Sequence, residues 1–136
     1  MMIYPMFVMV MLTFIVLLFT LRVRIAALRR GEVSLDYYSL FQGEEISDLI
    51  IKTSRNVANL FEVPVLFYAA GVLYVAMEIS DPLPVTLAWI FVIARVMHTC
   101  IHLSYNNIMH RLVVFGLGNL SVLGMWILIA SSTDSV

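Results

Sequence analysis

The sequence predicts an all-α membrane protein, a bundle of four transmembrane helices, and three observations support this prediction. Of the 136 residues, 62% are hydrophobic and only 12% are charged, and the mean hydropathy is +0.97, well outside the range of soluble domains. Four apolar stretches are each long enough to cross a hydrocarbon core of about 30 Å, which takes about 20 helical residues. Because these stretches use most of the chain, we expect residues 1–136 to form a single four-helix transmembrane domain.

The first and last stretches are the most uniformly apolar. Residues 2–21 and 112–133 contain no Lys, Arg, His, Asp or Glu. The first run has no positively charged start, is too long for the core of a signal peptide and ends in arginines, so we expect it to remain in the mature protein. Pro5 suits the first turn of a helix and Gly31 suits the position just beyond its end, which predicts a first helix reaching to about residue 30.

The two middle stretches carry polar residues inside apolar runs. The pattern predicts one continuous helix over about 50–78, with Ser47 or Asp48 as its N-terminal cap. It predicts another over 83–103, opened by the Pro-rich turn at 80–84. The segment 104–110, "SYNNIMH", is predicted to separate this helix from the last one.

The positions of Lys and Arg predict how the chain is oriented in the membrane. The basic residues that flank the first and third loops are Arg22, Arg24, Arg29, Arg30, Lys52 and Arg111. The termini and the second loop carry neither Lys nor Arg, so the positive-inside rule places the first and third loops in the cytoplasm. We therefore expect an integral, multi-pass membrane protein with both termini on the non-cytoplasmic side.

The net charge of −1 argues against a nucleic-acid partner. Binding to a row of phosphates requires a cluster of Lys and Arg, and the sequence contains none.

Polar side chains form a stripe on each of the two middle helices. Arg55, Asn59 and Glu62 are spaced i, i+4, i+7, which places them on one face of a helix. In the next helix Arg95, His98 and His102, spaced i, i+3, i+7, form a second stripe. Both stripes lie toward the predicted cytoplasmic end of their helices.

Two further residues, Tyr105 and Arg111, follow at the same end of the predicted bundle. An ionisable group at membrane depth costs about 2.5 to 3.5 kcal/mol on insertion scales, whereas an interhelical hydrogen bond in lipid contributes about 0.6 to 2 kcal/mol. Interhelical hydrogen bonds alone therefore do not offset the free-energy cost of placing these residues in the membrane. We expect them to surround a ligand, with Glu62 and Arg95 as a buried ion pair.

The chemistry of these side chains indicates what kind of ligand they bind. Guanidinium groups bind carboxylates through paired hydrogen bonds, a glutamate binds an ammonium group, and an asparagine binds a peptide group. A small zwitterionic peptide with additional carboxylates matches this set. An arginine beside a thiol also stabilises the nucleophilic thiolate.

These residues resemble the motifs of the MAPEG family, the membrane-associated proteins of eicosanoid and glutathione metabolism. The most specific parts are R-x3-N-x2-E at Arg55, Asn59 and Glu62, followed by Pro64, and "ARVMHT" with Arg111 placed 16 residues after Arg95. The chain resembles a bacterial-type member, and its third helix is most similar to that of microsomal prostaglandin E synthase.

The resemblance implies a four-helix protomer that assembles into a homotrimer, with glutathione bound between protomers near the cytoplasmic face and a lipophilic small molecule entering from the membrane lipid. It implies that Arg55, Asn59, Glu62 and His98 contact glutathione. It also implies that Arg111 lies beside the glutathione sulfur and is the catalytic residue. Arg95, His102 and Tyr105 share this layer, so we expect them to line the same site.

Three hypotheses about function follow. The first is a glutathione-dependent transferase or peroxidase that acts on lipophilic electrophiles or lipid hydroperoxides. The second is a non-catalytic lipid-binding or scaffold protein of the same fold. It is favoured by His102, where the family commonly has tyrosine. The apolar Leu112 after Arg111 and the single residue between Glu62 and Pro64 also depart from the family pattern, and these departures bear on thiol handling and substrate class.

The third hypothesis is a metal or haem site. His98 and His102, spaced i, i+4, can share a metal, with Glu62 as a further ligand. A histidine inside a membrane helix more often bonds to a neighbouring side chain. We therefore predict no metal at this site.

Overall fold

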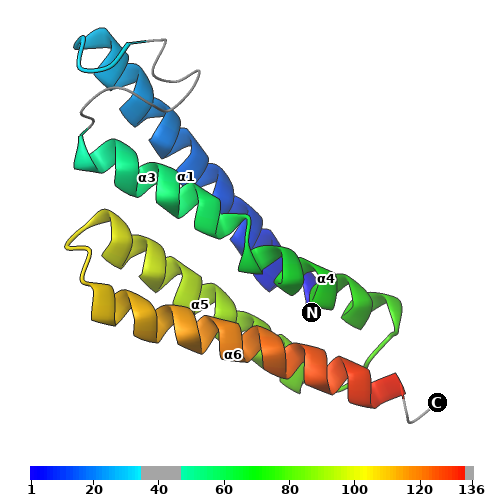
Figure 1. The fold of residues 1–136 in the computed structure, drawn as a ribbon. Helices are drawn as coiled ribbons and strands as arrows, with labels where there is room; N and C mark the ends of the chain where they lie inside the picture. The colour runs from blue at the N-terminus through cyan, green and yellow to red at the C-terminus, as the bar shows by residue number, and fades with distance from the viewer. Residues whose placement is uncertain (35–46, 134–136) are drawn as a thin grey trace.

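The chain folds into helices that cross the membrane four times. The computed structural model describes residues 1–34 and 47–133, and in these ranges every regular element is an α-helix. Four segments are long and apolar enough to span a membrane, with α3 and α4 forming one of them, which confirms the predicted fold class. The helices (Figure 1) are α1 (Ile3–Arg29), α3 (Asp48–Leu60), α4 (Val63–Ala76), α5 (Leu83–Leu103) and α6 (Ile108–Thr133).

The C-terminal end of α1 is closed by a glycine, as the sequence predicts. Gly31 adopts a φ of 68°, a left-handed conformation in which a side chain would be strained. This lets the backbone N–H of Gly31 donate to the carbonyl of Leu28 and that of Glu32 donate to the carbonyl of Ala27, both at 3.1 Å. These two bonds satisfy carbonyl groups that the helix end would otherwise leave unpaired.

The second span is broken in the middle, so the predicted continuous helix over 50–78 is wrong. Helix α3 ends at Leu60 and α4 begins at Val63, with Glu62 at φ −89° and ψ −94° between them. Pro64 explains the break, because a proline has no N–H for the carbonyl four residues earlier, that of Leu60, and its ring clashes with that carbonyl. Figure 1 shows the ribbon changing direction at this point.

Helices α5 and α6 form a tightly packed hairpin. The turn is shorter than the predicted segment 104–110, because α6 already begins at Ile108. Asn107 favours this early start, since its Oδ1 accepts a hydrogen bond from the backbone N–H of His110 at 3.1 Å. His110 and Arg111 therefore belong to the first turn of α6.

One apolar core joins the helices around two stacked rings. Phe67 of α4 and Phe91 of α5 are both fully buried, with ring centroids 4.6 Å apart. Met9 of α1 and Met125 of α6 pack into the same cluster. Buried aromatic rings contribute large apolar areas. This core therefore stabilises the packing of the helices in the half of the bundle where α4 lies.

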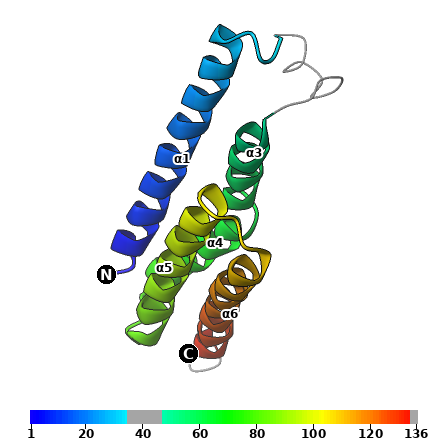
Figure 2. The same ribbon diagram turned by 90° about the vertical axis from the view of Figure 1, so that its left-hand side faces the viewer.

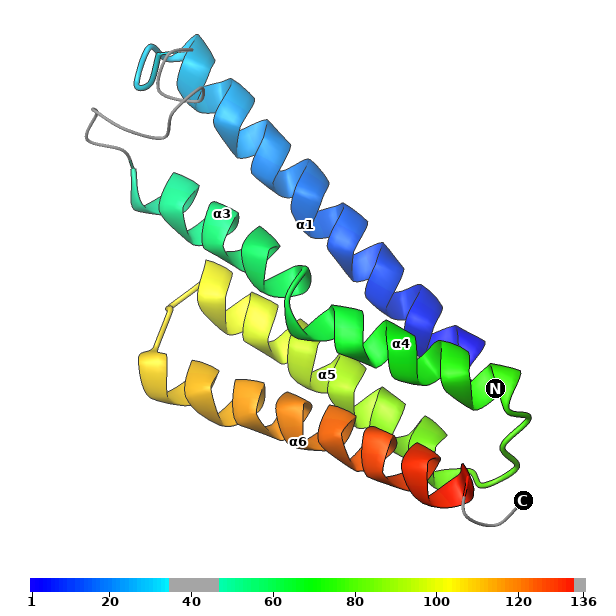
Figure 3. The ribbon, with the colours of Figure 1, turned by 45° about the vertical axis from the view of Figure 1, so that its right-hand side comes forward.

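The two ends of the bundle differ in what they contain. Both chain termini and the turn between α4 and α5 lie at one end (Figure 3). The opposite end holds the C-terminus of α1, the start of α3 and the α5–α6 turn. Toward that end α1 stands apart from α5 and α6 (Figure 2).

Among the described glycines, Gly71 of α4 makes the closest contact with a side chain of α1. A Cβ added there would lie 2.7 Å from Met6 Sδ, whereas a Cβ at Gly116 would meet nothing within 4 Å. We expect Gly71→Ala to lower the free energy of unfolding by about 1 kcal/mol, because Met6 must move. Gly116→Ala, the matched control, should raise it by up to about 1 kcal/mol, because alanine favours the helix. Thermal unfolding in detergent measures both, and equal effects would contradict the predicted crowding at Met6.

Candidate functional site

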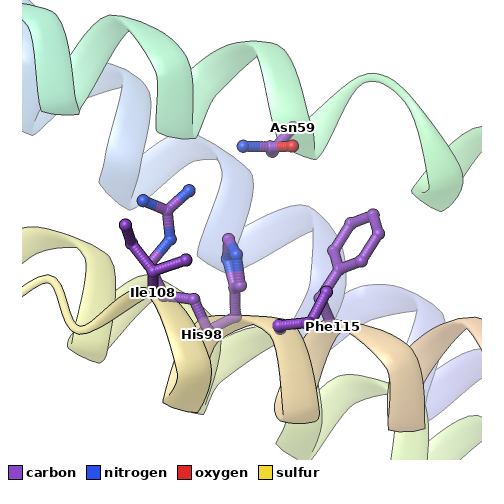
Figure 4. Close-up of a pocket in the computed structure, with 6 residues that line it drawn as sticks. Asn59, His98, Ile108 and Phe115 are labelled. Atoms are coloured by element: carbon purple, nitrogen blue, oxygen red, sulfur yellow. The ribbon is translucent and has the colours of Figure 1, made fainter.

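A pocket opens between α3, α5 and α6 in the half of the bundle where the polar stripes lie. Its volume is about 240 Å³. Figure 4 shows Asn59 of α3 facing His98 of α5 and Phe115 of α6 across this space. The lining residues are Asn59, His98, Ile108, Arg111, Leu112 and Phe115. Three of the predicted site residues, Asn59, His98 and Arg111, are thus brought together.

Arg111 is held in the pocket by the α5–α6 turn. Its Nη1 donates a 2.8 Å hydrogen bond to Oδ1 of Asn106, and Asn106 itself is fixed by a backbone bond to the carbonyl of Ile101. The Nε of Arg111 is buried and has no hydrogen-bond partner among the described residues. Arg111 therefore keeps a positively charged group beside the pocket with donor capacity to spare.

Two histidines extend the polar layer behind Arg111. His98 is 3% exposed and His102 is 1% exposed, and their rings meet edge to face with centroids 5.7 Å apart. The Nδ1 of His98 and both ring nitrogens of His102 lack partners within the part of the chain that the structure describes. The ring of Phe115 lies 5.8 Å from that of His98 and forms an apolar wall beside it.

Among the residues that the structure describes, Arg95 is the largest fully buried side chain, at 1% exposure. Its Nη2 donates to the backbone carbonyl of Asn59 at 2.5 Å. That carbonyl lies in the last turn of α3, where helical carbonyls lose their partners and the helix dipole favours a cation. The guanidinium carbon also lies 5.7 Å from the centre of the Phe115 ring. Arg95 thus touches two pocket residues without lining the pocket itself.

The predicted ion pair between Glu62 and Arg95 does not form. Among the described residues the ion pair that forms joins Arg30 to Glu32, far from the pocket. Glu62 is exposed, because the helix break carries it out of the stripe that an unbroken helix would have formed. Arg95 instead donates a hydrogen bond to the backbone carbonyl of Asn59.

Arg55 and Tyr105 also lie outside the pocket lining. Arg55 is exposed, and its backbone carbonyl accepts a 3.0 Å hydrogen bond from Nδ2 of Asn59. Tyr105 is 62% exposed at the α5–α6 turn, where its hydroxyl lies 3.0 Å from Nδ1 of His110. In a single chain, neither side chain reaches the pocket.

The sequence prediction missed a buried polar pair between α3 and α5. Asn56 is fully buried, and its Oδ1 accepts a 3.5 Å hydrogen bond from the hydroxyl of Thr99, while its Nδ2 has no partner among the described residues. The sequence did contain an indication of this pair, because a polar residue such as Asn56 within a membrane span usually faces the interior of the helix bundle. Phe115 was also missed, since no pattern distinguishes it from other aromatic residues of α6.

Unpartnered buried polar atoms therefore gather around one pocket. Each buried donor or acceptor without a hydrogen bond costs about 1 to 3 kcal/mol, so natural proteins keep few of them and usually for a functional reason. Most of those found in the described residues lie on α3, α5 and α6, and two of the residues that carry them, His98 and Arg111, line the pocket. They belong to Asn56, Arg95, His98, His102 and Arg111. Guanidinium and imidazole groups are side-chain types that bind carboxylates and other anionic groups.

The two histidines do not form a metal centre with other residues. Across residues 1–34 and 47–133, no group of three or more His, Cys, Asp or Glu side chains is arranged to hold a metal ion. The third ligand suggested from the sequence, Glu62, is exposed beyond the helix break.

Comparison with known proteins identifies the family. No individual curated protein matches the chain. The family model described as the MAPEG family matches residues 2–131, nearly the whole chain and all of the residues discussed above. The chain therefore belongs to the MAPEG family.

Proposed function

We propose that the protein is a membrane-bound, glutathione-dependent transferase or peroxidase that acts on lipophilic electrophiles or lipid hydroperoxides. Members of this family generally use glutathione. The observation that supports the proposal most is the set of buried polar atoms without partners around a pocket that has His98 and Arg111 on its wall. Glutathione carries two carboxylates and a thiol, which match the guanidinium and imidazole groups among them.

Arg111 has the central catalytic role in this proposal. Its guanidinium group stabilises the thiolate of glutathione. In conjugation the thiolate sulfur bonds to an electrophilic carbon and displaces the leaving group of that carbon. In peroxide reduction the sulfur attacks one peroxide oxygen, the O–O bond breaks to release the lipid alcohol, and a second glutathione converts the glutathione sulfenic acid to glutathione disulfide and water.

The bond of Arg111 to Asn106 holds the side chain at the α5–α6 turn, so the charge is in place before the substrate binds. Asn59 and His98 bind the peptide part of glutathione. Arg95 holds Asn59 through its backbone carbonyl, and the ring of His102 packs against that of His98.

A second protomer completes the site in this proposal, as in a homotrimer. The pocket of about 240 Å³ within one chain is smaller than the roughly 300 to 1,000 Å³ of typical ligand pockets. Arg55, Glu62 and Tyr105 are exposed in the single chain. A neighbouring protomer packed against this face would cover them and bring them to glutathione.

The proposal takes the pocket end to face the cytoplasm, where glutathione is available, and the basic residues at this end support that orientation by the positive-inside rule. Both termini then lie on the non-cytoplasmic side, in agreement with four crossings. The lipophilic substrate reaches the pocket from the membrane lipid.

A glutathione titration of the detergent-solubilised protein tests the proposal. We expect binding at millimolar glutathione, and we expect Glu62→Gln to weaken it about tenfold, because a charged hydrogen bond to the glutathione ammonium group is lost. Glu32→Gln is the matched control, because Glu32 pairs with Arg30 away from the pocket. Isothermal titration calorimetry measures both affinities. Absence of binding by the unmodified protein would refute the proposal.

A second candidate function is a non-catalytic lipid-binding or scaffold protein. The bond from Arg95 to the Asn59 carbonyl and the Thr99–Asn56 pair favour it, because both tie helices together without a ligand. If this candidate is correct, Arg55→Leu or Glu62→Leu disturbs assembly, and no thiol-dependent turnover is observed.

A further inference from the structure

The turn between α5 and α6, residues 104–107, is closed by hydrogen bonds to both helices. The backbone N–H of Asn106 donates to the carbonyl of Ile101 at 2.8 Å, and that of Arg111 donates to the carbonyl of Asn107 at 3.1 Å. Asn106 adopts a φ of 50°, in the left-handed region. Glycine, asparagine and aspartate are the residue types that adopt this conformation most readily.

Asn106 also carries the acceptor for Arg111. Its Oδ1 accepts the 2.8 Å hydrogen bond from Nη1 of Arg111. The three residue types that suit a left-handed position differ in what they offer a guanidinium group. Glycine has no side-chain acceptor, aspartate has a negatively charged one, and asparagine has a neutral one. Asparagine is therefore the type that fixes Arg111 without neutralising its charge.

The groups around Arg111 leave that charge unneutralised. The charged and titratable side chains that face this layer from α5 and α3 are Arg95, His98, His102, Arg55 and Glu62. The one carboxylate among them, that of Glu62, is exposed and acts on Arg95. His110, in the first turn of α6, contacts the hydroxyl of Tyr105. Among the described residues Arg111 forms no ion pair, and an aspartate at position 106 would give it one.

We propose that Asn106 is a positioning residue that sets how much of the bound glutathione is in the thiolate form, by fixing Arg111 through a neutral acceptor. This inference rests on the proposed function, because it takes the glutathione sulfur to lie beside Arg111. A positive charge beside a thiol favours the thiolate and lowers the pKa of the thiol. A negative acceptor offsets that charge, and loss of the acceptor leaves the guanidinium group less fixed, so either change should raise the pKa of the thiol.

Asn106→Asp tests the charge of the acceptor. Aspartate suits the turn and keeps the hydrogen bond, so the variant should fold and bind glutathione. We expect the pKa of the bound glutathione thiol to rise by about 1 to 2 units, because an opposite charge now faces Arg111. The thiolate absorbs in the ultraviolet, so a pH titration of the detergent-solubilised protein with saturating glutathione measures this pKa. Since turnover requires the thiolate, the pH at which turnover is half-maximal should rise by the same amount.

Two further variants separate the contact from the turn. Asn107→Asp is the matched control, because it makes the same change of charge at the adjacent residue. The Oδ1 of Asn107 accepts from the N–H of His110 and not from the Arg111 side chain, a capping role that aspartate also fills, so the pKa of the thiol should stay close to that of the unmodified protein. Asn106→Gly keeps the left-handed turn and removes the acceptor. At neutral pH its turnover number should fall about 3- to 10-fold, the effect of one lost hydrogen bond, with little change in the dissociation constant of glutathione.

Three results would overturn the inference and leave the proposed function intact. They are an unchanged pH profile in Asn106→Asp, an unchanged turnover number in Asn106→Gly, and an equal shift in Asn107→Asp, which would make the effect one of net charge at the turn. If the unmodified protein bound glutathione without forming any thiolate, the catalytic role of Arg111 and this inference would both be wrong. Titrating the unmodified protein beside the variants distinguishes these cases.

Discussion

Replacing Arg111 with alanine should lower the turnover number for glutathione conjugation by a factor of about 10² to 10³, the usual effect of removing one group that stabilises the developing charge. The structure gives Arg111 a place on the pocket wall and a fixed contact with Asn106. Its guanidinium group is assigned to the sulfur and not to the peptide, so the dissociation constant of glutathione should change little. Steady-state kinetics with a small electrophile measure the first quantity, and calorimetry measures the second.

Arg30→Ala is the matched control for this experiment. It removes the same side chain, but Arg30 is exposed and pairs with Glu32, so turnover and binding should both remain at the unmodified level. If Arg111→Ala weakened glutathione binding and left the turnover number unchanged, Arg111 would be a peptide-binding residue and the catalytic role would be wrong.

Replacing Arg95 with methionine should weaken glutathione binding at least about tenfold while changing the free energy of unfolding by less than about 2 kcal/mol. Two effects on stability oppose each other. The variant loses the bond to the Asn59 carbonyl, about 1.5 to 3 kcal/mol for a charged donor. It also removes two buried nitrogens, Nε and Nη1, that have no partners among the described residues. Binding suffers because Asn59 and Phe115 lose the group that touches both.

The opposite pattern would identify Arg95 as a packing residue. In that case Arg95→Met would destabilise the protein strongly, and the folded fraction would bind glutathione with unchanged affinity. Arg95→Lys provides the conservative comparison, because it retains the charge and one donor to the Asn59 carbonyl but not the planar group beside Phe115. We expect its affinity to lie between those of the unmodified protein and the methionine variant. Denaturant titration in detergent and calorimetry supply the two measurements.

Hydropathy predicted the four spans, because length and apolar content are properties that each segment carries by itself. The same approach predicted the end of α1, since Gly31 is a local signal. Hydropathy did not predict the break in the second span, because the apolar pattern continues on both sides of Pro64. In α6 the start was misplaced by a few residues, as the cap supplied by Asn107 is a weaker signal than hydrophobicity.

The site was predicted less completely than the fold. The sequence predicted that Asn59, His98 and Arg111 lie at one end of the bundle, and the structure brings these three residues to one pocket. Their binding and catalytic roles stay predictions. Partners depend on how separate helices meet, and here the prediction failed: Glu62 lies outside the layer, and Arg95 bonds to a backbone carbonyl. No side-chain pattern can reveal that the backbone carbonyl of Asn59, in the last turn before the helix break, is the acceptor.

The interruption at Pro64 has a consequence for how this protein can change during evolution. The oxygen that anchors Arg95 belongs to the main chain at position 59 and not to the asparagine side chain. A mutation of Asn59 therefore alters what the site recognises while leaving the anchor in place. At residue 59 the side chain faces the pocket, while the backbone carbonyl binds Arg95. Proteins of this fold can therefore change the side chain at this position, and with it the ligand, without losing the contact that holds α3 to α5.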